Sequence, residues 1–174
     1  MAVPQGEFMT KVKLDDIDLQ ILEHLQADGR MTNVDLARQV GISAPPCLRR
    51  VRALEESGFI KGYHAEVDAE SLGFEVTVFA MVGLASQAET DLVAFEERVR
   101  AMPLVRECWM LNGEIDFILK IVARDLAEFQ GFLTRELTPA PNVASVKTSF
   151  TIRNGKHAPG VPFGLSPRPP HRGR

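Results

Sequence analysis

The sequence predicts an α+β protein in which a small helical domain precedes a domain of alternating strands and helices. In the first third of the chain, apolar residues recur every three or four positions in short segments separated by glycine-containing turns. In the remainder, continuous apolar runs such as 76–84 alternate with segments of helical spacing. The length of 174 residues suits one large domain or two small ones, and 45% apolar residues is ordinary for a globular protein.

Two short helices are expected at the start of the first domain. The first helix contains the apolar residues that recur at helical spacing from Leu14 onward. Asp15 lies at its start, where a carboxylate favours a helix N-terminus. Gly29 is expected as the glycine that ends this helix. Thr32 opens the second helix, and Asp35 three residues later makes a near capping box.

A third helix is expected to begin abruptly after Ser43, which is a good N-cap residue. Pro45 and Pro46 follow directly, and proline loses little in a first helical turn because the N–H groups there have no internal partner. Gly58 is expected to stop the helix, and residues 59–67 are expected to form a short strand.

The third helix has two kinds of surface. Its inner face is predicted to consist of Cys47, Val51 and Leu54. The remaining surface carries Arg49, Arg50 and Arg52. Because a tight turn joins this helix to the preceding one, the pair is predicted to be a helix-turn-helix.

The second domain is predicted to have the order β-α-β-β-α-β, which is the ferredoxin-like unit. The strands are expected over 76–84, 104–111, 115–122 and 142–152, and the helices over 90–102 and 125–137. Asn112-Gly113 between the second and third strands is a strong hairpin signal.

The predicted organisation is a helix-turn-helix domain over 11–64, a linker over 65–75, a ferredoxin-like domain over 76–153 and a disordered basic tail over 154–174. The net charge of −3 hides differences between these parts. Residues 11–64 hold eight basic and eight acidic side chains, whereas 65–153 hold eight basic and fourteen acidic ones. The tail holds four basic and no acidic residues, so the acidic excess lies in the second domain.

Several classes of function lack their usual signals. No apolar stretch approaches the length of a membrane span, and no secretory signal is evident, so a cytoplasmic location without a membrane partner is expected. The four histidines are scattered and the two cysteines are expected to be buried thiols, so no metal site and no cofactor are expected. No nucleophile elbow or phosphate loop occurs, so no catalytic residue is assigned.

The arginine-bearing helix indicates binding to double-stranded DNA. Arginine can bridge guanine O6 and N7 or bind phosphate, and the N-terminal residues of the second helix of a helix-turn-helix reach base edges. The candidate DNA-binding residues are Thr32, Ser43, Ala44, Pro45, Arg49, Arg50 and Arg52. Of the arginines, Arg49 is expected at base edges, and Arg50 and Arg52 nearer phosphates. The alternative is a solvated face on which Arg52 pairs with Glu55 or Glu56.

The stretch LDDIDLQILEHLQADGRMTNVDLARQVGISAPPCLRRVRALEESGFIKGYHAEVD resembles the N-terminal half of the Lrp/AsnC family of transcriptional regulators. The β-α-β-β-α-β unit that follows is similar to that family's effector-binding and dimerising domain, and the likeness spans about residues 14–152. The resemblance implies a homodimer that often assembles further, with an octamer expected here, and a small amino acid as effector.

The resemblance also implies an effector site around the loop after the second strand. A G-x-x-D loop there helps to bind an amino acid between subunits, and this sequence has Gly113, Glu114 and Asp116 at that place. Glycine lets backbone N–H groups approach an α-carboxylate, and a carboxylate can hold an α-ammonium group. By resemblance, Met110, Ser149 and Thr151 would complete the pocket.

Two other functions remain open on the sequence. An architectural DNA-compacting protein would bind DNA without an effector. Sirohaem decarboxylases resemble the same two-domain layout, but they would need tetrapyrrole-binding and catalytic side chains, and His64 stands at the domain junction without other histidines. The apolar strands 76–84 and 115–122 also favour self-association, because the sheet face that carries no helix needs a cover.

Overall fold

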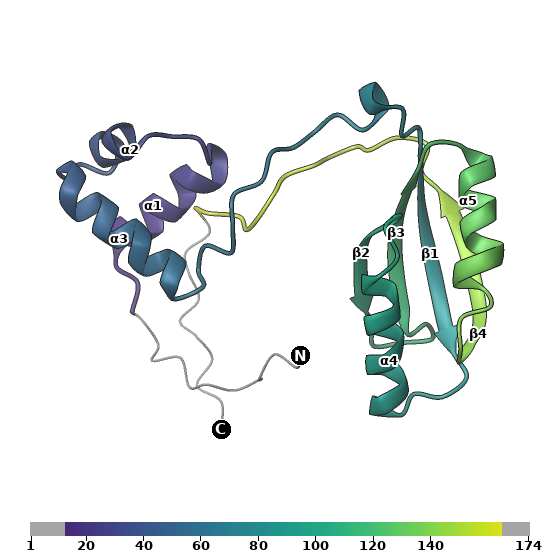
Figure 1. The fold of residues 1–174 in the computed structure, drawn as a ribbon. Coiled ribbons are helices and arrows are strands. Elements are labelled where there is room, and N and C mark those ends of the chain that lie inside the picture. Colours follow the sequence, from purple (N-terminus) through teal and green to yellow (C-terminus); the bar gives the residue numbers. More distant parts are fainter. Residues whose placement is uncertain (1–12, 165–174) are drawn as a thin grey trace. The chain divides into compact units, whose positions relative to one another are not determined.

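The computed structural model describes residues 13–164, which divide into two compact units (Figure 1). One unit comprises residues 13–66 and 157–164, and the other comprises residues 67–156. The first unit is helical and the second contains a four-stranded sheet with helices, which confirms the predicted α+β class. Within the described range, none of the helices combines the length and the apolar character needed to cross a bilayer.

Three helices build the first unit: α1 (Asp16–Ala27), α2 (Asn33–Gln39) and α3 (Ala44–Glu56). They enclose a small core made of Ile21, Leu36, Ala37, Val40, Cys47 and Leu54. The turn between α2 and α3 contains Gly41, whose φ of 72° is in the left-handed region that glycine tolerates. The predicted helix-turn-helix is therefore present.

The start of α1 agrees with the sequence, but its end does not. Asp15 is the N-cap, and Asp15 and Asp18 each accept a hydrogen bond from the other's backbone N–H, at 2.9 and 3.1 Å. At the other end, the capping residue is Asp28, in an extended conformation with φ −143°. Gly29 does not adopt the left-handed conformation, because the chain leaves the helix through Asp28, whose side chain accepts the Arg30 N–H.

The short strand expected over 59–67 is not formed, and the described part of the first unit contains no strand. Gly58, with φ 74°, ends α3 as expected. The Phe59 and Ile60 N–H groups then both donate to the Leu54 carbonyl, so they satisfy the end of the helix instead of a sheet.

The second unit has the predicted order. After a 3-10 turn (Glu70–Leu72), its elements are β1 (Val76–Leu84), α4 (Glu89–Arg100), β2 (Val105–Met110), β3 (Phe117–Ala123), α5 (Leu126–Phe132) and β4 (Val143–Phe150). All three pairings in the sheet are antiparallel, and the strand order is β2-β3-β1-β4. The second helix continues from α5 into a π-helical turn over Leu133–Leu137, where a single α-helix was expected.

The two faces of the sheet differ. Alternate residues of β1 and β3 point into a core beneath the helices, where Phe117, Leu119 and Ile121 are completely buried. Phe95 and Val99 of α4 and Phe129 and Phe132 of α5 belong to the same core, so both helices cover this face. The opposite face, here called the open face, carries Phe79, Met81, Trp109, Ile118, Lys120 and Val122.

The chain returns to the first unit at its C-terminal end. Residues 157–164, expected to belong to a disordered tail, lie against α1. The Gln26 side chain donates to the Val161 carbonyl at 2.7 Å and accepts from the Val161 N–H at 2.8 Å, as a neighbouring strand would. The segment has few apolar residues that could join a core. It is held through its backbone by these hydrogen bonds to Gln26. The rest of the expected tail, 165–174, lies outside the described residues.

Candidate nucleic-acid interface and effector site

The beginning of α3 is shaped by its two prolines. Ser43 is the N-cap residue, as expected, but its side chain makes no capping hydrogen bond. A capping hydroxyl accepts from the N–H of the second or third helical residue, and these are Pro45 and Pro46, which have none. The Ser43 hydroxyl is therefore not used by its own helix and lies on an exposed residue.

The helix α3 has an apolar inner face and a cationic outer face. Cys47 and Leu54 are buried in the core of the first unit, as predicted. Pro45, Leu48, Arg49 and Arg52 are exposed, and their spacing of three, four and seven residues places them on one side of a helix. These four residues are called the outer face below.

Two of the three arginines lie on this outer face. Arg49 and Arg52 form no ion pair or hydrogen bond with any residue that the structure describes, so their guanidinium groups are available to an external anion. The alternative of pairing between Arg52 and Glu55 or Glu56 is not formed. An arginine held by no internal carboxylate keeps its planar fork for guanine or phosphate.

Arg50, which was predicted to lie near phosphates, has internal partners that the other two arginines lack. Its Nη1 donates to Asp15 at 2.8 Å and to Asp18 at 2.7 Å, and its side chain is 31% exposed. The N–H of Asp18 and then the Arg50 guanidinium hold the pKa of Asp15 below its ordinary value. Helical rotation turns Arg50 toward α1, so this arginine ties α3 to the capped start of α1 instead of pointing at a phosphate.

Thr32 and Ala44 lie where α2 and α3 begin, and both are engaged within the unit. The Thr32 hydroxyl accepts from the Asp35 N–H and donates to the Asp35 carboxylate at 2.6 Å. This hydrogen bond, and then Arg38, lowers the pKa of Asp35. The Ala44 carbonyl accepts from the Asn33 side chain at 2.9 Å, which fixes the turn between the two helices.

The predicted effector loop joins β2 to β3, and four of the six predicted effector residues lie in it or at its ends. Met110 ends β2, Gly113 and Glu114 are exposed in the loop, and Asp116 precedes β3. The loop is longer than the two-residue turn that Asn-Gly indicates, and Gly113 is not in the left-handed region. A Cβ at Gly113 would meet no atom within 4 Å, so the fold itself does not require glycine there.

Asp116 is a buried residue, only 8% exposed, and its carboxylate is held by two donors. Oδ2 accepts from the Leu84 N–H at 2.6 Å, and Oδ1 accepts from the Gln87 side chain at 2.8 Å. Each carboxylate oxygen has a second lone pair, so the group can still accept from a ligand. Gln87 was missed by the sequence reasoning, because a glutamine 29 residues before its partner leaves no local signal.

The remaining two effector candidates, Ser149 and Thr151, lie elsewhere in this protomer. Ser149 is on β4 and Thr151 follows its last residue, at the opposite edge of the sheet from β2. Ser149 pairs with Phe79 and the Thr151 N–H donates to Thr77, near the start of β1, whereas the effector loop adjoins Val82 near its end. The separation along β1 alone is roughly 10–16 Å. One protomer therefore does not bring the two groups together.

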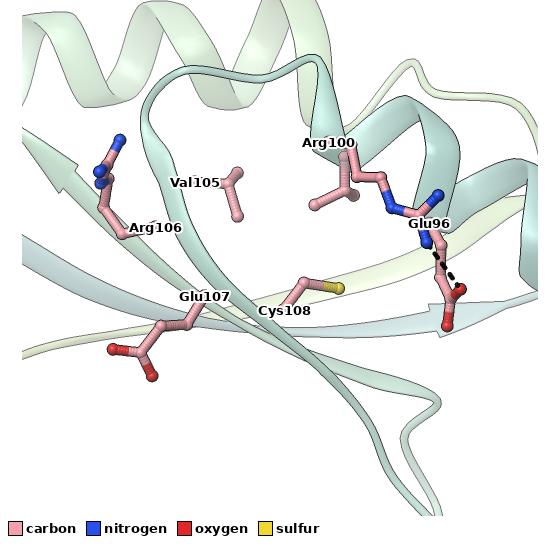
Figure 2. Close-up of a pocket in the computed structure, with 7 residues that line it drawn as sticks. Glu96, Arg100, Val105, Arg106, Glu107 and Cys108 are labelled. Carbon is pink, nitrogen blue, oxygen red and sulfur yellow. Dashed lines mark ion pairs between the residues drawn. The ribbon is translucent and has the colours of Figure 1, made fainter. Parts of the chain in front are cut away.

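A groove of about 340 Å³ lies between α4 and the edge strand β2 (Figure 2). Glu96 and Arg100 form an ion pair at 3.9 Å on its rim, and the Cys108 sulfur points into it. Partial desolvation of the Cys108 thiol in this groove, and then Glu96, raise its pKa to about 11, so little thiolate forms at neutral pH. Cys108 is an exposed residue, so the expectation of two buried cysteines is correct only for Cys47. None of the predicted effector residues lines this groove.

Each of the two units matches a known protein family. Residues 14–61 match a family described as winged helix-turn-helix DNA-binding, and residues 77–161 match the Lrp/AsnC ligand binding domain. The chain is 55% identical over 150 residues to a leucine-responsive regulatory protein of Rhizobium meliloti, covering 86% of this chain and 96% of that one. It is 45% identical over 142 residues to the Bkd operon transcriptional regulator of Pseudomonas aeruginosa, covering 82% and 93%.

Solved structures agree with these matches. A transcriptional regulator from Neisseria meningitidis, crystallised as a complex with L-Met, superposes with a TM-score of 0.82 at 34% identity, covering 87% of this chain and 98% of that one. An AsnC family transcriptional regulator from Agrobacterium tumefaciens superposes with a TM-score of 0.79 at 32% identity, covering 86% and 97%. Both likenesses include the helical and the sheet-containing units.

Proposed function

The chain belongs to the Lrp/AsnC family of transcriptional regulators, and from this premise we propose that α3 reads DNA while the sheet-containing unit senses an amino acid. It is a DNA-binding regulator and not an enzyme. The observation that supports the DNA-reading assignment most directly is the pair of arginines on the outer face, neither held by a carboxylate of the described residues.

Arg49, near the middle of α3, reaches base edges, and Arg52 one turn further reaches a phosphate. The Ser43 hydroxyl and the exposed ring of Pro45 lie closest to the helix start, where a helix-turn-helix enters the major groove. We assign Arg50 to the packing of α3 on α1 and not to this interface, because Asp15 and Asp18 hold its Nη1.

The effector is a free amino acid that binds at the loop between β2 and β3. Its α-ammonium group donates to Asp116, and the backbone around Gly113 receives its α-carboxylate. A regulator at 34% identity has been crystallised with L-Met, which supports this class of ligand. The Gln87 amide already occupies one oxygen of Asp116, so the ligand shares that carboxylate with Gln87 or displaces it.

A second copy of the chain covers the open face of the sheet. Trp109 is 60% exposed there, and Phe79, Met81 and Ile118 lie beside it, so an apolar surface needs a cover. We propose that in this assembly Ser149 and Thr151 of a second copy lie near the effector loop, from which they are distant within one chain. We propose a homodimer that assembles to an octamer and acts in the cytoplasm.

The test is a thermal-shift screen of the twenty amino acids on the full chain, run beside a measurement of particle size. At least one amino acid is expected to raise the melting temperature. The same amino acid should change the affinity for a DNA duplex, because coupling between two sites is reciprocal. A protein that responds to none of the twenty would instead be an architectural DNA-binding protein.

Variants locate the site. Asp116→Asn keeps the shape of the side chain but removes its charge, so the response should be lost while the particle size is unchanged. Glu97→Ala removes an exposed carboxylate on α4 and should respond as the parent does. If Asp116→Asn still responds normally, the effector site is not at this loop.

A further inference from the structure

Leu48 lies on the outer face of α3, along one border of it, and was not among the residues that the sequence suggested. It is 40% exposed, although it stands on a helix whose other large aliphatic side chains pack inward. Pro45 lies one turn before it, and Arg49 and Arg52 follow it on the same side. Together with Ala53 and Glu56, these residues line a shallow groove of about 310 Å³.

The charges around Leu48 identify its partner as a polyanion. Arg49 and Arg52 flank it, and no described residue neutralises them. Beyond them, Glu55 and Glu56 close the helix and would be repelled by phosphates. The part of α3 from its start to Arg52 therefore approaches the duplex, and Leu48 lies within this part.

We infer that Leu48 contacts the 5-methyl group of a thymine in the major groove, next to the base pair read by Arg49. This rests on the proposed docking of α3. A leucine has no hydrogen-bonding group, and the thymine methyl is the one apolar feature on the major-groove edge of the four base pairs. The recognised half-site thus contains a thymine beside a guanine.

The apolar ring of Pro45 strengthens the argument. Pro45 and Leu48 are three residues apart, so they form a continuous apolar strip along one border of the outer face. Arg49 and Arg52 form a parallel cationic strip beside it. A helix that only bound phosphates would have no use for an exposed apolar strip toward the DNA.

The experiment begins with a pool of random duplexes from which the full chain selects its sites. Selected sites should carry a thymine at a fixed distance from a guanine. Each thymine is then replaced singly by deoxyuridine, which lacks only the methyl group. One replacement per half-site should weaken binding about fourfold, the effect of losing one buried methyl group.

Leu48→Ala should bind the thymine and deoxyuridine duplexes equally, because the side chain that senses the methyl is gone. Since Leu48 lies outside the core, this variant should fold normally. Phe59→Ala is the matched control, because Phe59 is 45% exposed in the same unit but follows the end of α3. Phe59→Ala should keep the fourfold preference for the thymine duplex over the deoxyuridine duplex. If Phe59→Ala loses this preference, the assignment to Leu48 is wrong.

Two failures are distinguishable. If Arg49→Ala with Arg52→Ala binds duplexes as the parent does, α3 does not dock and the proposed function itself is wrong. If that double variant loses binding but the parent binds thymine and deoxyuridine duplexes equally, the docking stands and the contact by Leu48 is wrong. A Leu48→Ala variant that still prefers thymine would also overturn the inference.

Discussion

Two sides of one helix use arginine in opposite ways. On the inner side of α3, Arg50 is held by two carboxylates of α1 and joins the helices of the first unit. On the outer side, Arg49 and Arg52 have no partner among the described residues. Adjacent residues on a helix differ by about 100° in direction, so Arg49 and Arg50 face different surroundings. A count of positive charges along the sequence therefore overstates the charge that DNA would meet.

The largest expected effect comes from the apolar part of the inner side. Leu54 is almost completely buried against α1 and α2. Leu54→Ala should destabilise the first unit by about 2–5 kcal/mol, because it leaves a cavity in a small core. Thermal unfolding followed by far-UV circular dichroism measures this loss. A change below about 1 kcal/mol would mean that the inner side of α3 is not packed as described.

On the outer side, Arg49→Ala should cost about 1–3 kcal/mol of DNA binding and relax the preference for guanine at one position of the half-site. Its melting temperature should match that of the parent, because the side chain has no described partner to lose. Fluorescence anisotropy with a selected duplex and its single-base variants gives both quantities. Equal losses for every base at that position would assign Arg49 to a phosphate instead.

Arg50→Ala should show the reverse behaviour. It leaves Asp15 and the mostly buried Asp18 without their cation, and about 1 kcal/mol of stability should be lost, since the Arg50 side chain is 31% exposed and partly screened by water. DNA affinity measured well below the melting temperature should be nearly unchanged. Combined with Asp18→Asn, the loss should be smaller than the sum of the two single losses.

The same ion pairs predict a small dependence of stability on pH. The pKa of Asp15 is lowered in the folded state, chiefly by the Asp18 N–H and then by Arg50. A lowered pKa means that this stabilisation is complete above the ordinary value of 3.8 and is lost as pH falls through the lower, folded value. Between pH 6 and pH 3 the parent should lose more stability than Arg50→Ala. Parallel losses would show that Arg50 does not influence Asp15.

Most of the fold could be predicted from the sequence because its signals are local. The strand over 76–84 has the predicted bounds, and Gly58 and Ser43 mark the ends of α3 as expected. The predictions that were wrong concern segments whose structure depends on a partner far away in the sequence. Residues 59–67 form no strand because no neighbouring strand is available to them, and residues 157–164 are held by Gln26, which is far away in the sequence.

The two sites follow the same rule. The DNA-reading side lies on one helix, so residue spacing alone places Pro45, Arg49 and Arg52 together. Spacing could also have separated Arg50 from them, but only the carboxylates of α1 explain what it does. The effector candidates come from two edges of a sheet, and the strand order β2-β3-β1-β4 separates Met110 from Ser149 in a way that no linear pattern reveals.

The most direct test of the different roles of the inner and outer arginines of α3 is the salt dependence of DNA affinity for Arg52→Ala and Arg50→Ala. The logarithm of the binding constant is plotted against the logarithm of the salt concentration for each variant and for the parent. Arg52→Ala should flatten the slope by about 0.9 for each phosphate contact removed, and Arg50→Ala should leave it unchanged. A slope flattened equally by Arg50→Ala would contradict the assignment of opposite roles to the two sides of α3.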